Sequence, residues 1–276
     1  KETIFPKLKH KKFKEIVGHI DSMETKDDLV YIQVNGETHF YDYVIDCRGT
    51  PTDYKDYVVS DVLPLNHALV HTIDKPGDWN HTKHIATENG WMFGIPLQTR
   101  QNYGYMFNDN ITTIEEAKED LSKIFKTELN LKEFKFKPYH ASVFLKDRVL
   151  KNGNRALFFE PLEAVSGVMY DQINRLMWDH IYGKKSEDEL NKQCVNISKK
   201  CENFIAFVYS ESTKFKSKFW EETRKKTNKH LESKDWLETL EFVIKKIKSD
   251  SLNDRGINHM SFPFAPAQWK EYFKYL

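Results

Sequence analysis

One stretch, residues 156–181, constrains the fold of this chain more than any other. It begins with an apolar run at 156–159 and continues through two acids, Glu160 and Glu163, to a turn of small residues at 164–167. The apolar positions that follow recur at mostly helical spacing, so the pattern predicts a strand, a turn and then a helix. The first amides of a helix lack internal partners and carry roughly half a positive charge from the helix dipole. We therefore expect that an anion or a flat ligand can approach this turn beside Glu163. An acid in a first helical turn is also commonly a solvated cap, and that alternative stays open.

Strands are predicted in two other places. Over residues 29–47, two runs rich in β-branched and aromatic residues flank an Asn-Gly pair at 35–36, which is typical of a hairpin with a type I′ turn. A second Asn-Gly pair at 89–90 leads into alternating bulky residues that predict two strands over 91–107. Between them, residues 51–89 contain several prolines, and we expect a loop-rich segment there.

Helices are predicted mainly in the second half of the chain. Residues 113–129 form an amphipathic pattern that begins with a capping box, Thr113 and Glu116. Apolar positions over 190–208 and 236–247 trace two further helices, and they place Cys194 and Cys201 in the core. We therefore expect a chain of the α/β class, with α+β organisation over these 276 residues. Its sheet-rich part would comprise residues 1–163 and its helical part residues 164–276.

Composition excludes several classes of function. The chain has 42 basic and 41 acidic residues and a formal charge of +1, which gives no case for a nucleic-acid or anionic-membrane partner. Its apolar runs are shorter than the roughly 18–20 residues of a membrane span. Three cysteines without a CxxC pair favour a reduced, cytoplasmic setting. The lysines at 7–14 suit a solvated face better than a phosphate site.

Histidines raise the possibility of a metal site. His67 and His71 are spaced for one face of a helix, and His81 and His84 lie close together. No acid or cysteine pattern accompanies them, so we interpret them as ordinary core or surface residues and predict no metal.

Four segments resemble, in the same order, motifs of the flavin-dependent tryptophan halogenase family. The string EPLEAVSG at 160–167 closely resembles the family's EPLEST-type motif, and WMFGIP at 91–96 is similar to its WxWxIP signature. The weaker segments are IDCRG at 45–49, similar to IDCSGF, and the Phe-Trp pair at 219–220. Phe93 stands where the signature has its second tryptophan, and Leu157, aligned without a gap before the EPLE string, stands where the family usually has glycine.

The resemblance implies a flavin monooxygenase-like fold and a role for particular residues. In such an enzyme reduced FAD, oxygen and a halide (chloride or bromide) halogenate an electron-rich aromatic substrate. Glu163 would be catalytic, the backbone amides of Val165 and Ser166 would bind the halide, and Trp269 would close the substrate chamber. The flavin would lie against Gly49, Ala164 and Gly167, and the tunnel wall would comprise Trp91, Phe93, Ile95 and Pro96.

Some parts that the resemblance implies are missing from the sequence. There is no GxGxxG phosphate loop after a strand, and no GxGE-type turn to supply the family's lysine. We therefore expect the later part of a longer enzyme or an inactive remnant, one that would not halogenate by itself. A separate flavin reductase and a small aromatic substrate are the implied partners, and a homo-oligomer is possible. The alternative is a noncatalytic or non-halogenating binding protein of the flavin monooxygenase type.

Overall fold

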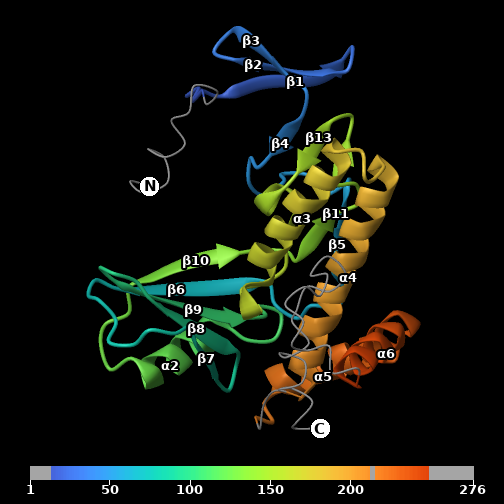
Figure 1. Cartoon of the computed structure of the whole chain (residues 1–276). Coiled ribbons are helices and arrows are strands. Elements are labelled where there is room, and N and C mark those ends of the chain that lie inside the picture. Colours follow the sequence, from blue (N-terminus) through green and yellow to red (C-terminus); the bar gives the residue numbers. More distant parts are fainter. Residues whose placement is uncertain (1–13, 212–214, 249–276) are drawn as a thin grey trace. The chain divides into compact units, whose positions relative to one another are not determined.

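The computed structural model describes residues 14–211 and 215–248, and Figure 1 shows the order of their elements. The chain divides into two compact units. Of the described residues, the smaller unit comprises 14–45 and 146–150, and the larger comprises 46–145, 151–211 and 215–248. The strand-rich part of the sequence ends at residues 162–165, where η2 (Leu162–Ala164) and α3 (Val165–Ile181) begin, whereas the predicted division at 163 and 164 into two parts stays a prediction.

The smaller unit is built on the predicted hairpin. Strands β1 (Ile20–Lys26), β2 (Leu29–Val34) and β3 (Glu37–Tyr41) form an antiparallel sheet in the order β1-β2-β3. The turn between β2 and β3 has Asn35 at φ 53° and Gly36 at φ 80°, so both of its central residues have the positive φ of a type I′ turn. The hairpin is confirmed, although its second strand ends at Tyr41 and the chain then begins a separate strand, β4 (Val44–Asp46).

The larger unit contains a five-stranded antiparallel sheet. Its order is β10 (Leu131–Lys135), β6 (His67–Ile73), β9 (Gln101–Phe107), β8 (Trp91–Pro96) and β7 (Lys83–Ala86). Helix α2 (Ile114–Ile124) covers one face, where Ala117 and Leu121 pack with residues of β6, β8 and β9 in one buried cluster. The predicted strands over 91–107 are therefore confirmed.

The predicted capping box is present at the start of α2. Thr113 Oγ1 accepts a hydrogen bond from the Glu116 amide, and the Glu116 carboxylate accepts one from the Thr113 amide. The helix ends at Ile124 rather than at Leu129, because the amide of Phe125 closes the last turn on the carbonyl of Leu121 and Phe125 is already extended.

The segment 51–89, which we expect to be loop-rich, also contains three strands. It contributes β5 (Tyr57–Val59), β6 and β7, and β6 lies inside the main sheet. The pattern of β6 hides its strand character because most of its residues are buried and apolar and polar residues do not alternate. His67 and His71 consequently lie on a strand and not on a helix.

Two short sheets lead into the helices. Their orders are β14 (Leu157–Phe158), β11 (Tyr139–Ala141), β5, and β12 (Leu145–Lys146), β13 (Val149–Lys151), β4. The 3-10 turns η1 (Gly153–Arg155) and η2 (Leu162–Ala164) flank β14. Helices α3 (Val165–Ile181), α4 (Glu187–Glu211), α5 (Lys218–Leu231) and α6 (Lys234–Lys248) follow, as Figure 1 shows. The predicted strand, turn and helix over 156–181 are confirmed, and so is the α+β architecture.

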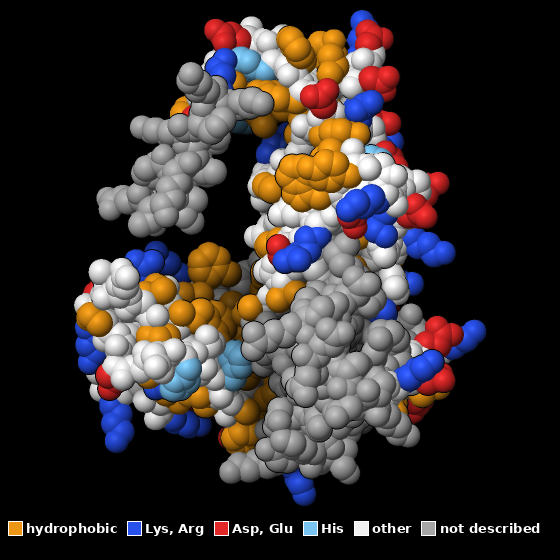
Figure 2. Space-filling view, in the orientation of Figure 1, with side chains coloured by type: hydrophobic (Ala, Val, Ile, Leu, Met, Phe, Trp, Pro, Cys, Tyr) orange, Lys and Arg blue, Asp and Glu red, His pale blue; other side chains and the backbone are white. Residues whose placement is uncertain are grey.

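Helix α3 contacts α4 along one side and keeps aromatic side chains on the other. Trp178 and Tyr182 stack with ring centroids 5.7 Å apart although they are 58% and 69% exposed. Figure 2 shows hydrophobic side chains at this part of the surface among charges of both signs. Cys194 and Cys201 on α4 are buried, as predicted. Among residues 14–211 and 215–248, no helix is both long and apolar enough to cross a membrane.

Candidate functional site

The elbow between β14 and α3 holds a strained backbone. Ala164 lies in the left-handed region at φ 52° and ψ 31°, and its side chain does not cap the helix. A left-handed conformation costs an ordinary residue about 1–2 kcal/mol. Hydrogen bonds of the η2 turn offset this cost, because the Ala164 amide donates to the Pro161 carbonyl and the Val165 amide donates to the Leu162 carbonyl. The elbow is therefore fixed before any ligand binds.

The residues predicted to bind the halide lie at this elbow, together with Ala164 and Gly167, two of the three residues predicted to contact the flavin. Val165 is buried, and so is the Ser166 hydroxyl, which lies close to the Tyr170 hydroxyl. Gly167 is exposed, and a Cβ added there would meet no atom within 4 Å. The backbone of Glu163 lies in η2, but its side chain falls outside the described part of the structure, as does Trp269 altogether.

Trp91, Phe93 and Ile95 of β8, which are predicted to line the tunnel, alternate with Met92, which packs under α2, and therefore lie on the sheet face opposite α2. The rings of Trp91 and Phe93 lie side by side with centroids 6.2 Å apart. The Phe93 ring lies over Gly104 of β9 and fills the space that a side chain there would need, because an added Cβ would be 2.3 Å from the ring. Ile95 is exposed and Pro96 is half-buried at the end of the strand.

Two cavities lie next to the elbow and this sheet face. The aromatic cavity has a volume of about 240 Å³, and its wall comprises His84, Ile85, Ala86, Trp91, Leu162, Val208, Tyr209 and Trp220. The second cavity, of about 330 Å³, is lined among others by Thr50, Phe93, Phe134, Phe136, Phe158 and Pro161. Trp91 and Leu162 thus face one cavity, while Phe93 and Pro161 face the other. The elbow and β8 together separate two apolar chambers.

A buried chain of hydrogen bonds joins the two motifs. The Trp91 indole Nε1 donates to the Tyr209 hydroxyl at 2.6 Å, and this hydroxyl donates to Glu160 Oε1 at 2.8 Å. All three residues are buried, and Glu160 Oε2 has no partner among the described residues. Burial raises the pKa of Glu160 to about 8, and the bond from Tyr209 opposes the rise only in part. Glu160 therefore carries a proton near neutral pH.

Sequence reasoning missed the role of Glu160. It treated the acid as a neighbour of Glu163 across Pro161, whereas the structure places it in the core, 49 residues from its partner Tyr209. One local signal was available. Glu160 directly follows the apolar run 156–159, and an acid buried next to such a run normally has a hydrogen-bond partner or a counter-charge.

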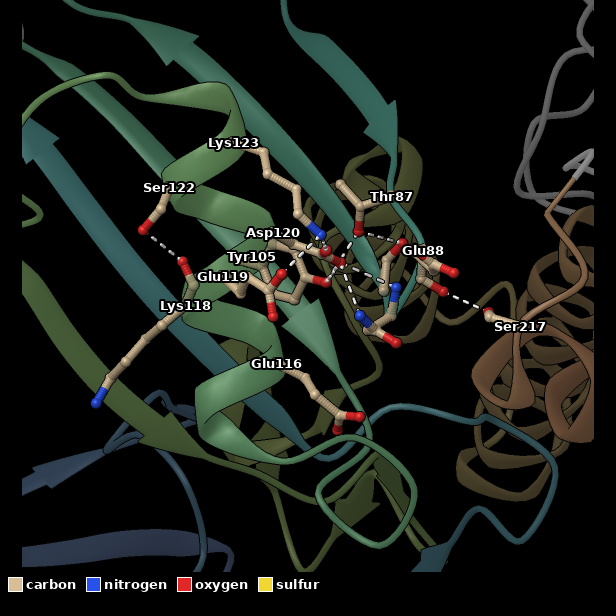
Figure 3. A network of polar contacts seen from close by, with 12 residues as sticks. Thr87, Glu88, Tyr105, Glu116, Lys118, Glu119, Asp120, Ser122, Lys123 and Ser217 are labelled. Atoms are coloured by element: carbon tan, nitrogen blue, oxygen red, sulfur yellow. Dashed lines mark hydrogen bonds and ion pairs between the residues drawn. The ribbon is translucent and has the colours of Figure 1, made fainter.

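A second polar network holds the turn between β7 and β8 (Figure 3). Asp120 of α2 is buried and accepts hydrogen bonds from the Tyr105 hydroxyl at 2.7 Å and from the Asn89 amide at 3.0 Å. Lys123 lies 3.5 Å from its other oxygen. The Thr87 hydroxyl in turn donates to Tyr105 at 2.9 Å. This carboxylate therefore fixes the turn that precedes Trp91.

The same turn holds the first residues of α5. The Trp220 indole Nε1 donates to the Thr87 carbonyl at 2.7 Å, and the Ser217 hydroxyl donates to the Glu88 carbonyl. Ser217 is also the N-cap of α5. Because Trp220 forms part of the aromatic cavity, Asp120 positions that wall through the turn without touching the cavity.

Replacing Asp120 by Ala is expected to destabilise the protein, because the Tyr105 hydroxyl and the Asn89 amide lose a buried acceptor. Each unsatisfied group costs about 1–3 kcal/mol. The measurement is the free energy of unfolding in denaturant. Glu119→Ala is the matched control, because Glu119 is the exposed neighbour on α2 and is expected to change stability by about 0.5 kcal/mol at most. Equal losses in the two variants would show that the network contributes nothing.

Gly49 follows β4 at φ 86°, and an added Cβ there would meet no atom within 4 Å. Arg48, which replaces the usual serine of this motif, donates two hydrogen bonds of 2.9 Å to Asp46. Burial of Asp46 opposes its ionisation, but the bonds from Arg48 outweigh burial and hold its pKa below the usual value. The Arg48 side chain is thus paired with Asp46 at the end of β4, whereas the space where a side chain at position 49 would begin is open.

The histidines contact acids and aromatic rings. His67 Nε2 lies 2.9 Å from Glu133 and Nδ1 lies 3.4 Å from Asp109, and the ring stacks on Phe107. His84 packs edge-on against Trp91. Within the described ranges, no three His, Cys, Asp or Glu residues are grouped so that they could hold a metal ion.

Comparison with known proteins gives a consistent result. A family model described as tryptophan halogenase matches residues 5–252. Tryptophan 7-halogenase KtzQ of Kutzneria sp. (strain 744) is 23% identical over 223 residues, which cover 74% of this chain and 40% of that protein. Tryptophan 6-halogenase ThaL of Streptomyces albogriseolus is 27% identical over 189 residues, which cover 64% of this chain and 34% of that protein. The matched part of this chain therefore covers well under half the length of each of these two relatives.

Solved structures share the fold. BrvH, a flavin-dependent halogenase from Brevundimonas sp. BAL3, superposes with a TM-score of 0.63 at 22% identity, covering 76% of this chain and 47% of that one. A tryptophan halogenase from Shewanella frigidimarina NCIMB 400 gives a TM-score of 0.66 at 18% identity, covering 92% of this chain and 52% of that one. The fold expected from the motifs is therefore confirmed.

Proposed function

The chain belongs to the tryptophan halogenase family, and from this premise we propose that the full-length protein is a flavin-dependent halogenase of electron-rich aromatic rings. One observation carries the proposal. The elbow that bears the family's glutamate stands between two apolar cavities, one with Leu162 and Trp91 in its wall and one with Pro161 and Phe93. A reagent made on one side would need to pass only the elbow to reach a ring on the other side.

The second cavity and the open glycines fit a flavin. Its aromatic side chains can contact a flat ring system, and the free space above Gly167 and Gly49 lets such a ring approach the backbone. When bound, reduced FAD with oxygen would supply the oxidation of the halide. Leu157, which is buried where the family usually has glycine, narrows the room for the cofactor on the β14 side.

The amides at the start of α3 would hold the halide. The Val165 amide already donates to the Leu162 carbonyl, so we assign the first contact to the Ser166 amide and the second to Val165 in competition with that bond. An exposed helix terminus stabilises an anion by only about 0.3–1 kcal/mol. Exclusion of water by the apolar walls strengthens the interaction, because the local dielectric constant falls.

Glu163 would act as the base of the reaction. In this role its carboxylate accepts the proton that leaves the ring carbon after the halogen has bonded to it. General-base catalysis typically contributes about 10²–10⁴ in rate. The ring itself would bind in the aromatic cavity, where Trp91, Tyr209 and Trp220 offer flat apolar surfaces.

The test of this function is flavin binding by the full-length protein. We expect flavin absorbance to accompany the purified protein, or to appear on it when FAD is added. A colourless protein that gains no flavin would favour the second candidate, a noncatalytic binding module, for which the buried Leu157 is the specific observation. Halogenated indole formed with FAD, a flavin reductase, oxygen and chloride would exclude that candidate.

Gly167→Ala is expected to separate fold stability from flavin binding. Alanine in place of a helical glycine stabilises a helix by about 0.5–1 kcal/mol, and here the added Cβ meets no protein atom within 4 Å. The same methyl group would occupy the space we assign to the flavin, so the Kd for FAD should rise. Unfolding in denaturant and titration with FAD measure the two effects. A more stable variant with an unchanged Kd would remove Gly167 from the flavin site.

A separate flavin reductase, a homo-oligomer and a cytoplasmic setting stay predictions, as does the choice between chloride and bromide.

A further inference from the structure

We propose that Glu160 is a positioning residue for the reaction, and that its carboxyl group, acting through Tyr209, fixes the Trp91 ring and the elbow in one arrangement. This inference rests on the proposed function and adds a residue to its site. Glu160 is 1% exposed, so it can influence the reaction only through the residues that it holds. Those residues belong to three elements that are far apart in the chain, namely the elbow, β8 and α4.

The hydrogen bonds of the Tyr209 hydroxyl have a fixed direction. An indole nitrogen can only donate, and a tyrosine hydroxyl has a single proton to donate. The Trp91 indole Nε1 therefore donates to the Tyr209 oxygen at 2.6 Å, and the Tyr209 proton points to Glu160 Oε1 at 2.8 Å. Without an acceptor at Glu160 the Tyr209 hydroxyl can turn, and the bond that orients Trp91 loses its fixed partner.

Glu160 acts on the aromatic cavity from two sides. Its side chain holds Tyr209 and Trp91, which form part of the wall, and Leu162, two residues further along the backbone, forms another part. Leu162 also begins η2, the turn that carries the backbone of Glu163. One carboxyl group therefore links the wall to that turn. Displacing a reacting group by about 1 Å can cost roughly 10²-fold in rate, so the link matters where a ring has to lie beside its base.

Stability alone does not explain an acid at this position. Burial raises the pKa of the Glu160 carboxyl to about 8, because the charged form loses its water and the bond from Tyr209 offsets only part of that loss. Apolar groups of the same shape can replace a buried hydrogen-bonded pair with little loss of stability. A hydrogen bond also has a direction, however, and a satisfied buried network makes the groups in it rigid. The acid is therefore best explained by the geometry that it imposes on Tyr209 and Trp91.

The first test follows the Trp91 indole proton in the full-length protein. Its exchange with solvent deuterium, measured by ¹⁵N NMR and assigned with Trp91→Phe, requires neither flavin nor turnover. Glu160→Leu removes the acceptor but keeps a side chain of similar size, and we expect exchange to become faster by about tenfold or more. Glu160→Gln keeps a carbonyl acceptor and should restore slow exchange. Unchanged exchange in Glu160→Leu overturns the inference. Tyr209→Phe, which breaks both bonds, replaces Glu160→Leu if that variant does not fold.

The second test measures kcat and KM for indole with FAD, a flavin reductase, oxygen and chloride. We expect Glu160→Leu to lower kcat by about 10- to 100-fold while the Kd for FAD stays the same, and Glu160→Gln to recover most of the rate. Faster exchange of the Trp91 proton without a fall in kcat would overturn the inference, because the reaction would then not depend on this arrangement.

Tyr103→Phe is the matched control. The buried Tyr103 hydroxyl donates to Gln101 at 2.7 Å within the cluster under α2, so this variant loses a bond of the same kind at another place. Equal falls in kcat for Tyr103→Phe and Glu160→Leu would mean that a weakened fold causes the loss, and would count against the inference. If the unchanged protein forms no product, the proposed function fails, whereas the exchange rates still decide whether Glu160 holds Trp91.

Discussion

In the full-length protein, Glu163→Gln is expected to lower the rate of product formation by about 10²–10⁴ while flavin oxidation continues. Glutamine keeps the shape of the side chain but cannot accept the proton that leaves the ring. Product formed per flavin oxidised, followed by chromatography and absorbance in the same reaction, measures the effect.

The alternative for Glu163 is a solvated helix cap, and the same experiment distinguishes it. A cap contributes only a few tenths of a kcal/mol to about 1 kcal/mol of stability and has no effect on turnover. Glu221→Gln provides the control, because Glu221 is an exposed acid in the first turn of α5. If both variants halogenate as fast as the unchanged protein, Glu163 is not the base.

Glu160→Gln is expected to make the protein more stable at alkaline pH. The pKa of Glu160 is about 8 in the folded protein because of burial, against an ordinary value of 4.5. The folded state therefore holds a proton that the unfolded state has lost, and the contribution to stability is complete below about pH 4.5. It falls by about 1.4 kcal/mol per pH unit as the pH rises to about 8. Glutamine does not titrate, so this loss disappears.

The size of the effect follows from that slope. Above pH 8 the variant should be more stable by about 2–5 kcal/mol, since the glutamine carbonyl can still accept the hydrogen bond from Tyr209. Denaturant unfolding from pH 5 to pH 9 gives the comparison, with Glu232→Gln as an exposed control. Parallel pH profiles for Glu160→Gln and the unchanged protein would mean that Glu160 is not buried as a neutral acid.

Local chemistry explains what could be predicted from the sequence. The Asn-Gly pair at 35–36 specifies its turn through two positive φ values, and Thr113 with Glu116 specifies the start of α2. The small residues after Glu163 likewise predicted an elbow before α3. In each case the residues that determine the conformation lie within a few positions of one another.

The missed features depend on partners that are distant in the chain. Trp91 and Tyr209 are 118 residues apart, and Ser217 and the Glu88 carbonyl are 129 apart. Strand β6 was missed because both of its faces carry apolar residues, Leu69 in the cluster under α2 and Ala68 and Val70 in the second cavity, so apolar and polar residues do not alternate. The spacing of residues within a single segment does not reveal contacts of this kind.

The ring of Phe93 over Gly104 couples two neighbouring strands of the sheet. A side chain at position 104 would occupy space that the ring now fills, since its Cβ would lie 2.3 Å from the nearest ring atom. A larger residue at 104 therefore requires either that the Phe93 ring turns aside or that position 93 carries a smaller side chain. A variant at either position consequently has to be assessed together with the residue at the other.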